Sequence, residues 1–415
     1  MSNDELMSND EVLITCATII CHSDFFIPSP SVIYSRNAGN RDRMNPTEAR
    51  NSEAIRHLYV HFPFCARVCP YCAFYKTRGN AAEVGRFCEA LVRELEQQET
   101  AALVPSTIYF GGGTPTALKT SQLEVILSAF HQRLDLSELK EWTIEANPGS
   151  ISARKATLLK KFGLNRVSLG VQSWDNDLLN LLGREHNAVQ AEESFCIFRD
   201  TGFSNVSIDL MFALPGQTER QWRDSLQKTI TLKPEHISTY CLTYEEDTEF
   251  LARFERGEFS ADEEREAGFL EVAMTMLERA DYEHYEISNY ARPGFRSQHN
   301  QAYWRGADYL GLGPSAFSTR SFERWQNVAD HLEYARRLFA NQSPVASVER
   351  LTPEMKRMER IALGLRTREG ITTDTIAINR THALSRAGLL RHDTDRIVLT
   401  PAGKLLADSV AEELI

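Results

Sequence analysis

Three cysteines carry the most distinctive chemistry in this chain: Cys65, Cys69 and Cys72, in the spacing C-x3-C-x2-C directly after a predicted strand. A [4Fe-4S] cluster is normally held by four cysteine thiolates. Three thiolates leave one iron with an open position, which an exchangeable ligand can fill. The spacing therefore predicts an iron–sulfur cluster that also binds a small molecule.

Two other interpretations fit the same residues. A structural zinc site needs a fourth cysteine or histidine, and His57 and His61 are near in sequence. Alternatively, the three thiols are unrelated core residues, because free cysteine is among the most frequently buried residue types.

The elements that must position these residues alternate between short β-branched or aromatic runs and amphipathic helical stretches. This alternation is typical of βα units around a parallel sheet. The predicted strands are 58–61, 107–110, 142–145, 166–170, 206–210 and 237–242. The predicted helices include 82–98, 121–132, 189–201, 219–230 and 261–279.

Polar residues and glycines recur where the predicted strands end. In a βα barrel, the C-terminal ends of the strands form the active face. Taken singly, each residue has an ordinary explanation, since glycines make turns and carboxylates cap helices. Because they recur strand after strand, the sequence predicts a site for a charged ligand there. Its candidate residues are Gly112, Gly113, Thr114, Glu145, Gln172, Arg184 and Asp209.

Length and composition limit the class of protein. A chain of 415 residues with 42% hydrophobic and 25% charged residues fits one large globular domain plus a smaller one. The net charge of -11 argues against broad affinity for nucleic acid or anionic membranes. Eight cysteines in so long a chain do not form a disulfide framework, so we expect a reducing, cytoplasmic setting.

The first 53 residues read as a poorly ordered extension without clear periodicity. Their longest apolar run, 12–21, is too short to span a bilayer and follows an acidic segment, so we expect neither export nor a membrane span. Met44 stands shortly before the first predicted strand, and one hypothesis is that translation starts there and not at Met1.

The ordered motifs from about residue 55 onward resemble one family. The chain is similar to the radical S-adenosylmethionine (SAM) family of oxygen-independent coproporphyrinogen III oxidases and haem chaperones. The segments that carry the resemblance are 59–74, Gly-Gly-Gly-Thr-Pro-Thr at 111–116, Glu-Ala-Asn-Pro at 145–148, 166–173, Gly-Arg-Glu-His at 183–186, Asp-Leu-Met at 209–211 and Leu-Pro-Gly-Gln-Thr at 214–218.

The resemblance implies an α/β fold, a partial (βα)6 TIM-like radical SAM barrel over residues 54–290. It also implies that Cys65, Cys69 and Cys72 ligate a [4Fe-4S] cluster whose open iron binds SAM. The residues that it implies for the SAM site are Tyr59, Tyr71, Gly112, Gly113, Thr114, Glu145, Gln172, Arg184 and Asp209.

Two positions separate the chaperones from the oxidases in this resemblance. The oxidases have a further cysteine two residues after the last cluster cysteine, whereas this chain has Phe74, as the chaperones do. The segment 299–304 resembles an H-N-x-x-Y-W motif linked to haem binding, which implies that His299 is an axial ligand of haem iron. The other interpretation is a loop histidine packed on Trp304, with Asn300 shaping a turn.

Residues 291–415 predict a smaller, mainly helical domain that carries the haem motif. The expected elements are helices 355–366, 381–390 and 402–413, with a short hairpin at 391–400 before the last helix. This winged-helix-like pattern often binds DNA. The acidic net charge instead favours a lid or a partner-docking role.

The predicted function is that of a cytoplasmic haem chaperone, with haem, SAM and a [4Fe-4S] cluster as cofactors. Its expected partners are haem-acceptor proteins and an electron donor, without nucleic acid. The alternative is an oxygen-independent coproporphyrinogen III oxidase, which Phe74 disfavours. Radical modification of RNA is a weaker alternative. No catalytic residue is predicted, and whether the chain is an enzyme stays open at this stage.

Overall fold

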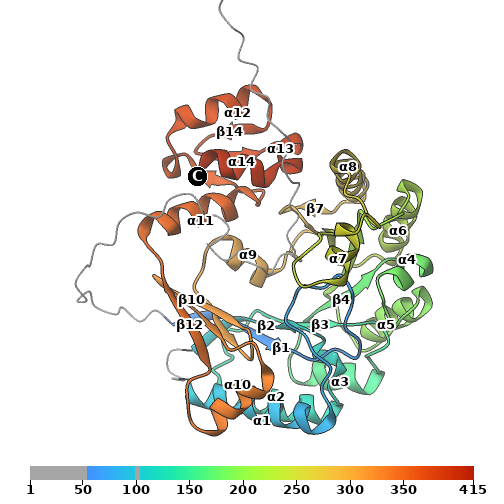
Figure 1. Cartoon of the computed structure of the whole chain (residues 1–415), viewed down its shortest axis with the longest axis vertical. Coiled ribbons are helices and arrows are strands. Elements are labelled where there is room, and N and C mark those ends of the chain that lie inside the picture. The colour runs from blue at the N-terminus through green and yellow to red at the C-terminus, as the bar shows by residue number, and fades with distance from the viewer. Residues whose placement is uncertain (1–53, 99–102) are drawn as a thin grey trace, which may run out of the picture.

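The computed structural model describes residues 54–98 and 103–415, so the predicted extension 1–53 and the proposed start at Met44 lie outside the described residues. Six consecutive parallel strands form the centre of a nine-stranded sheet (Figure 1). All six predicted strands are confirmed to within a few residues at each end. They are β1 (Ile55–Phe62), β2 (Leu103–Gly112), β3 (Glu141–Ala146), β4 (Arg166–Gln172), β5 (Val206–Phe212) and β6 (His236–Cys241).

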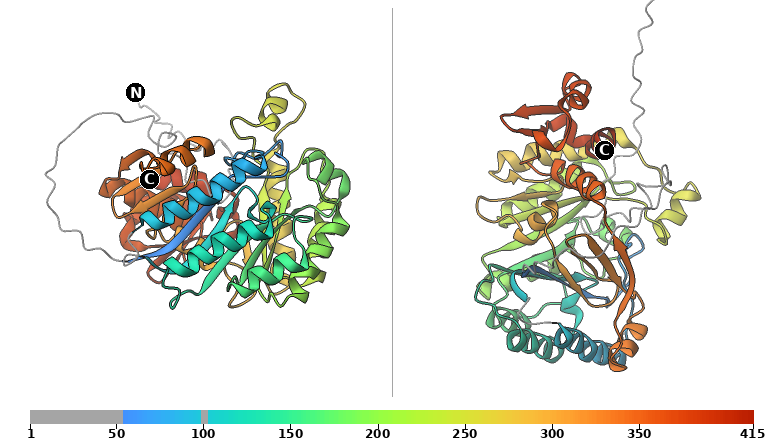
Figure 2. Two further views of the ribbon diagram at one scale, coloured as in Figure 1. Left: turned by 90° about the horizontal axis from the view of Figure 1, so that it is seen from below. Right: turned by 90° about the vertical axis from the view of Figure 1, so that its left-hand side faces the viewer.

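Helices cover the outer face of this sheet, as both views of Figure 2 show. The five predicted helices are confirmed, and further short helices lie in the connections. The helices of this region are α1 (Ala81–Gln97), α2 (Thr120–Arg133), α3 (Ala153–Lys161), α4 (Asn176–Leu181), α5 (Ala188–Asp200), α6 (Glu219–Leu232), α7 (Glu249–Glu255) and α8 (Glu263–Arg279).

Alternation along each strand separates the two faces of the sheet. In β1, Leu58, Val60 and Phe62 point outward and are completely buried. Phe62 packs against Phe87 of α1 with ring centroids 5.9 Å apart. Full burial of such a side chain contributes roughly 1.5–3 kcal/mol, so this outer layer supplies much of the stability of the barrel. The inward residues of the same strands are largely polar and remain for a site.

The barrel is open, which confirms the predicted partial (βα)6 architecture. The strand order β7-β8-β6-β5-β4-β3-β2-β1-β9 has two ends that do not pair with each other. The edge strands β8 (Asn289–Ala291) and β7 (Glu283–His284) are antiparallel additions beyond β6, and β9 (Leu310–Leu312) pairs in parallel with β1.

The domain boundary expected after residue 290 falls inside β8. Elements beyond it, such as β9, also belong to the barrel layer. Helix α10 (His331–Phe339) packs on α1, and the buried Glu94 of α1 joins the two. Its carboxylate accepts hydrogen bonds from Gly313 N (2.7 Å), Asn327 Nδ2 (2.7 Å) and Tyr334 Oη (2.6 Å). A small antiparallel sheet lies between β9 and the last helices, and sequence periodicity did not predict it. Its strands are β10 (Phe317–Arg320), β11 (Glu323–Asn327) and β12 (Val345–Arg350).

The C-terminal unit combines short helices with a three-stranded sheet, in the winged-helix-like order that the sequence predicted. It lies beyond the sheet in Figure 1, and helix α9 (Gln298–Trp304) stands between the two. The elements of the unit are α11 (Pro353–Leu365), β13 (Ile371–Thr372), α12 (His382–Arg386), β14 (Leu390–Asp393), β15 (Arg396–Leu399), α13 (Pro401–Leu405) and α14 (Ala407–Leu414).

Two of the helices predicted for this unit need correction. The helix expected over 381–390 is only α12, because Gly388 adopts a left-handed conformation (φ 74°) that ends it. The helix expected over 402–413 is divided at Leu406 into α13 and α14. Gly403 packs so closely on Leu389 that a Cβ there would meet the Leu389 carbonyl oxygen at 1.9 Å. None of the helices in residues 54–98 and 103–415 has the length and apolar character needed to cross a membrane.

Candidate cofactor site

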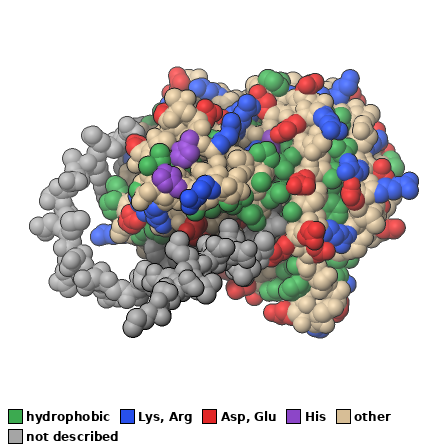
Figure 3. Space-filling model, turned by 90° about the horizontal axis from the view of Figure 1, so that it is seen from above, with side chains coloured by type: hydrophobic (Ala, Val, Ile, Leu, Met, Phe, Trp, Pro, Cys, Tyr) green, Lys and Arg blue, Asp and Glu red, His purple; other side chains and the backbone are tan. Residues whose placement is uncertain are grey.

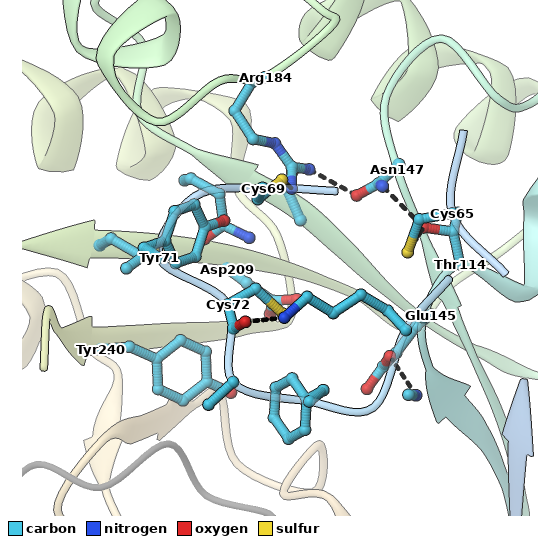
Figure 4. A pocket seen from close by; sticks show the side chains of 18 of the residues that line it. Cys65, Cys69, Tyr71, Cys72, Thr114, Glu145, Asn147, Arg184, Asp209 and Tyr240 are labelled. Carbon is cyan, nitrogen blue, oxygen red and sulfur yellow. Dashed lines mark hydrogen bonds between the residues drawn. The ribbon is translucent and has the colours of Figure 1, made fainter. Parts of the chain in front are cut away.

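A cavity of about 190 Å³ opens at the C-terminal ends of the parallel strands (Figure 4). It brings together eleven of the residues that the sequence predicted for the cluster and SAM. They are Cys65, Cys69, Tyr71, Cys72, Gly112, Gly113, Thr114, Glu145, Gln172, Arg184 and Asp209. Because parallel strands end at the same edge of a sheet, residues far apart in the chain converge there.

The cysteine loop between β1 and α1 is closed at its base by backbone hydrogen bonds. Cys65 N donates to Thr77 O (3.0 Å), and Thr77 N donates to Pro63 O (2.7 Å). Within the loop, the Lys76 ammonium donates to the Cys72 carbonyl oxygen. These bonds hold all three cysteines of the loop at the mouth of the barrel.

The three thiols line one cavity without converging on a single point. Within the part of the chain that the structure describes, no three His, Cys, Asp or Glu side chains are placed to hold one metal ion. The nearby histidines turn into the barrel: His57 bonds Thr107 Oγ1 (2.9 Å), and His61 bonds Tyr59 Oη (3.0 Å) and Tyr75 O (2.9 Å). The zinc interpretation therefore gains no fourth ligand from them. A four-iron cluster is larger than an ion, and its ligands stand further apart.

Two of the thiols have hydrogen-bond donors beside them. Arg184 Nη1 lies 3.7 Å from Cys69 Sγ, and Thr114 Oγ1 lies 3.5 Å from Cys65 Sγ. Asn147 connects the two donors, since its Oδ1 accepts from Arg184 and its Nδ2 donates to Thr114 Oγ1 (2.8 Å). Such outer partners orient metal ligands and tune the metal centre.

Burial opposes ionisation of the thiols in the protein without a cluster. It raises the pKa of Cys72 to about 11, although the Lys76 ammonium partly offsets this. Burial also raises the pKa of Cys65, with the Thr114 hydroxyl acting in the opposite direction. Iron binds thiolate and displaces the proton, so cluster assembly at this loop releases protons.

The loop that carries Arg184 is fitted tightly against the cysteine loop. Asp175 caps the N-terminus of α4 by accepting from Asp177 N (2.9 Å), and the helix ends before Gly183, whose φ is 65°. A Cβ at Gly183 would meet Pro70 Cδ at 2.8 Å. Glycine therefore allows both the left-handed turn and the close approach that brings Arg184 to Cys69.

The glycine run at the end of β2 lets the Glu145 carboxylate approach the backbone in the cavity wall. Glu145 accepts hydrogen bonds from Gly112 N (3.1 Å) and Tyr109 Oη (2.9 Å). Gly112 has φ 102°, and a Cβ there would meet the His61 ring at 2.5 Å. Burial raises the pKa of Glu145 to about 7; the Tyr109 hydrogen bond opposes this, and the nearby Asp209 charge adds to it.

Asp209 and Gln172 provide further polar groups at the strand ends. Asp209 accepts from Ser168 Oγ (2.8 Å) and Ser207 Oγ (2.9 Å), which hold the carboxylate at the cavity wall. Gln172 has φ 66°, and its Oε1 is buried without a hydrogen-bond partner among the described residues. A buried acceptor without a partner costs roughly 1–3 kcal/mol, so a ligand N–H or O–H that reaches it is favoured. The charged and amide groups together suit a zwitterionic ligand such as SAM.

Two predicted site residues lie elsewhere. Tyr59 is inside the barrel, where its ring stacks on Tyr109 with centroids 6.2 Å apart. His299 lies on α9 at the opposite end of the barrel and is completely buried. Its Nδ1 bonds Thr107 Oγ1 (2.8 Å). The structure thus places His299 in a helix and not in a loop, away from the cysteine cavity.

The cavity also contains residues that the sequence analysis did not assign to the site. Asn147 belongs to a motif quoted above, but nothing in the sequence indicated its contacts with Arg184 and Thr114. The end of β6 follows the same strand-end rule as the others, and that rule could have found this group. Its members are Tyr240, Cys241, Leu242, Thr243 and Glu245.

Comparison with known proteins agrees with this geometry. Residues 59–229 match the model of the Radical SAM superfamily. The solved structure of coproporphyrinogen III oxidase (HemN) from Escherichia coli superposes with a TM-score of 0.77 at 22% identity, covering 88% of this chain and 91% of that one. It shares the fold.

Curated relatives place the chain more narrowly. "Heme chaperone HemW" of Lactococcus lactis is 35% identical over 369 residues, 86% of this chain and 96% of the relative. The protein of the same name from Bacillus subtilis is 34% identical, over 86% of this chain and 98% of its own length. This chain belongs to the radical SAM superfamily and, within it, to the family of these HemW proteins. Membership in the superfamily implies a [4Fe-4S] cluster and SAM, which the residues of the cavity fit.

Proposed function

We propose that this protein is a haem chaperone, which binds haem and transfers it to haem-requiring acceptor proteins. The observation that carries the proposal is the match to proteins named "Heme chaperone HemW" along 86% of this chain. The match includes both the barrel and the C-terminal unit. The cysteine cavity would hold the cluster and SAM, at the end of the barrel opposite to His299.

Phe74 supports the chaperone over the oxidase. It lines the cysteine cavity at the position where the oxidases of the resemblance have a further cysteine. A phenyl ring offers neither a thiol nor a proton-transfer group at this point. The residue therefore favours a site that keeps the cluster and SAM but lacks the side chain associated with oxidative decarboxylation.

His299 remains the proposed axial ligand of haem iron, provided that α9 can move. Its Nε2 is buried without a hydrogen-bond partner in the described part of the chain. Burial lowers the pKa of His299 to about 3, so the imidazole is neutral, which is the form that ligates metals. Because the ring is completely enclosed, ligation requires α9 to move away from β2.

The proposed partners are haem-acceptor proteins and an electron donor for the cluster, in the cytoplasm. On the face of the molecule seen in Figure 3, Lys and Arg side chains are interspersed with Asp and Glu side chains. Such a mixed surface favours protein and small-molecule partners over nucleic acid.

An anaerobic haem titration of the cluster-reconstituted protein tests the proposal. We expect a saturable, stoichiometric change in Soret absorption, which His299→Ala weakens. Arg386→Ala, which changes an exposed residue of the C-terminal unit, serves as the matched control. Haem binding no stronger than that of an unrelated protein of similar size would refute the chaperone.

The oxidase remains the second candidate because the cysteine cavity brings together most of the residues proposed for the cluster and SAM, and the fold is shared with HemN. An assay of the reconstituted protein with coproporphyrinogen III, SAM and a chemical reductant decides between the two. We expect no protoporphyrinogen, and SAM-dependent formation of this product would establish the oxidase.

A further inference from the structure

A second cavity lies on the far side of α9 from the barrel interior, between α9, α11 and the sheet of the C-terminal unit. Its volume is about 360 Å³, within the roughly 300–1,000 Å³ typical of small-molecule sites. It does not contact the cysteine loop, and no step described so far uses it.

The charged side chains that line this second cavity are mostly positive. Arg305 at the C-cap of α9, Arg360 on α11 and Arg396 on β15 line it, and none of them has a carboxylate partner among the described residues; Arg305 donates to the amide oxygen of Gln301 (2.8 Å). The acidic residue in its wall, Glu369, is already paired with Arg296 at 2.7 Å. In a chain of net charge -11, three unpaired guanidinium groups around one cavity are unusual and indicate an anionic ligand.

The remaining wall is aromatic and apolar. Trp304 and Tyr285 contribute rings, and Ile371 contributes an aliphatic side chain. Trp304 is 8% exposed, and its indole Nε1 has no hydrogen-bond acceptor within the described ranges. A buried N–H without an acceptor is costly, and a ligand oxygen would satisfy it.

These features describe a ligand with carboxylates on a flat, apolar body. Guanidinium groups match carboxylates in a bidentate geometry, and aromatic walls accept planar rings. No His, Cys or Met is among the described residues that line the cavity, so these residues offer no ligand to iron. The recognition would be of the acid groups and not of the metal.

We propose that this cavity binds the carboxylate edge of a tetrapyrrole, with Arg305, Arg360 and Arg396 holding the two acid groups. The proposal rests on haem being the cargo of the chaperone and assigns its recognition to a surface that His299 does not reach. Entry at this cavity would place the tetrapyrrole directly against α9, the helix that carries His299.

Iron-free protoporphyrin IX separates carboxylate recognition from iron ligation. The full-length protein is titrated with protoporphyrin IX and with its dimethyl ester, and binding is followed by porphyrin fluorescence. The test variant is Arg360→Gln with Arg396→Gln, and the control is Arg386→Gln. Because these arginines are exposed or half-exposed, the double variant is expected to fold, and its thermal unfolding confirms this.

We expect the acid to bind saturably and the ester to bind at least tenfold more weakly. The double variant should weaken binding of the acid about tenfold or more, since each charge-assisted hydrogen bond contributes about 1.5–3 kcal/mol. Arg386→Gln should leave it unchanged. Equal binding of the ester, an unaltered double variant, or displacement of the porphyrin by equimolar inorganic phosphate would each overturn the proposal.

A parallel haem titration distinguishes this proposal from the proposed function. If wild-type protein binds neither haem nor protoporphyrin, the chaperone itself is refuted. If haem binds equally to the wild type and to the double variant, the chaperone stands and the assignment of the cavity fails.

Discussion

The two ends of the barrel are built from the same strands but differ in what their polar residues contact. At the C-terminal end, Glu145 and Gln172 face a cavity. At the N-terminal end, Thr107 and Glu141 face α9 and are satisfied by it. The comparison shows that polar alternation alone does not define a site. A site needs, in addition, an end of the barrel that no other element fills.

The closed end is a network of buried polar groups. Glu141 accepts hydrogen bonds from Gln298 N (2.8 Å) and His299 N (3.1 Å), and so satisfies two N–H groups in the first turn of α9, whose N-cap is Ser297. Thr107 Oγ1 lies between the rings of His57 and His299. Burial would lower the pKa of the enclosed Arg166, but nearby negative charge, chiefly that of Glu141, outweighs it and raises this pKa. We therefore expect changes at the open end to affect the cluster and SAM, and changes to the Glu141 and Thr107 network of the closed end to affect stability.

The largest effect is expected from Cys72→Ala at the open end. Removal of one thiolate should lower cluster occupancy at limiting iron by more than about 100-fold, since loss of an outer partner alone costs about 10–100-fold in metal affinity. Iron and sulfide content after anaerobic reconstitution measure it. Cys196→Ala, at an exposed thiol outside the cavity, is the control and should retain the cluster. A full cluster in Cys72→Ala would remove this residue from the ligand set.

The second effect is expected from Glu141→Ala at the closed end. The free energy of unfolding should fall by about 3 kcal/mol, because α9 loses the acceptor of two N–H groups and the buried Arg166 loses the chief negative charge that stabilises it. Urea denaturation measures it, with the exposed Glu138→Ala as control. SAM affinity of the folded variant should stay within about twofold. A drop in SAM affinity with unchanged stability would reverse the proposed roles of the two ends.

The third effect is the pH dependence of SAM binding. The pKa of Glu145 is raised to about 7, so below pH 7 the free protein holds this carboxyl protonated and without charge for the cationic groups of SAM. Affinity should therefore fall about tenfold per pH unit below 7 and level off above it. Calorimetric titrations from pH 5.5 to about 8.5 follow this. Glu145→Gln should bind weakly at every pH, and a level profile in the wild type would contradict the assignment.

The raised pKa of Glu145 affects the stability of the free protein in the opposite direction, so that stability falls where SAM affinity rises. The contribution of Glu145 to the free energy of unfolding is present below its unfolded pKa of 4.5 and is lost as the pH rises through about 7. SAM, by binding the ionised form, should offset this loss. The thermal stabilisation that saturating SAM provides is therefore expected to be larger at pH 8 than at pH 6.

The smallest effect is expected from Thr107→Val at the closed end. The variant keeps the shape of the side chain but removes the hydroxyl between two buried imidazoles. It should lower the free energy of unfolding by about 1 kcal/mol. Thr157→Val on the exposed face of α3 is the control, with an expected change below about 0.5 kcal/mol. A Thr107→Val variant as unstable as Glu141→Ala would mean that the Thr107 hydroxyl stabilises the packing of α9 as much as the Glu141 carboxylate does.

The repeated elements of the barrel were predictable because their pattern is local. Strand 206–210 and helix 219–230 read directly from short apolar runs and helical periodicity, and both occur as β5 and α6. The division at Leu406 was not predictable, since the helical periodicity of 402–413 continues through the residue whose backbone leaves the helical conformation. Short strands were also missed. The three residues of β9, for example, form a strand only because they pair with β1.

The sequence by itself determined the chemistry of the open end. The cysteine spacing, the glycine run and Glu145 are read from residue types, and the strand-end rule brings them to one edge without further information. Only the tertiary structure decided which polar residues stay available. His299 belongs to a motif that suggests a ligand, yet α9 packs against β2 and its ring bonds Thr107, 192 positions away in sequence. Burial depends on contacts between distant segments, and no local pattern of residues encodes it.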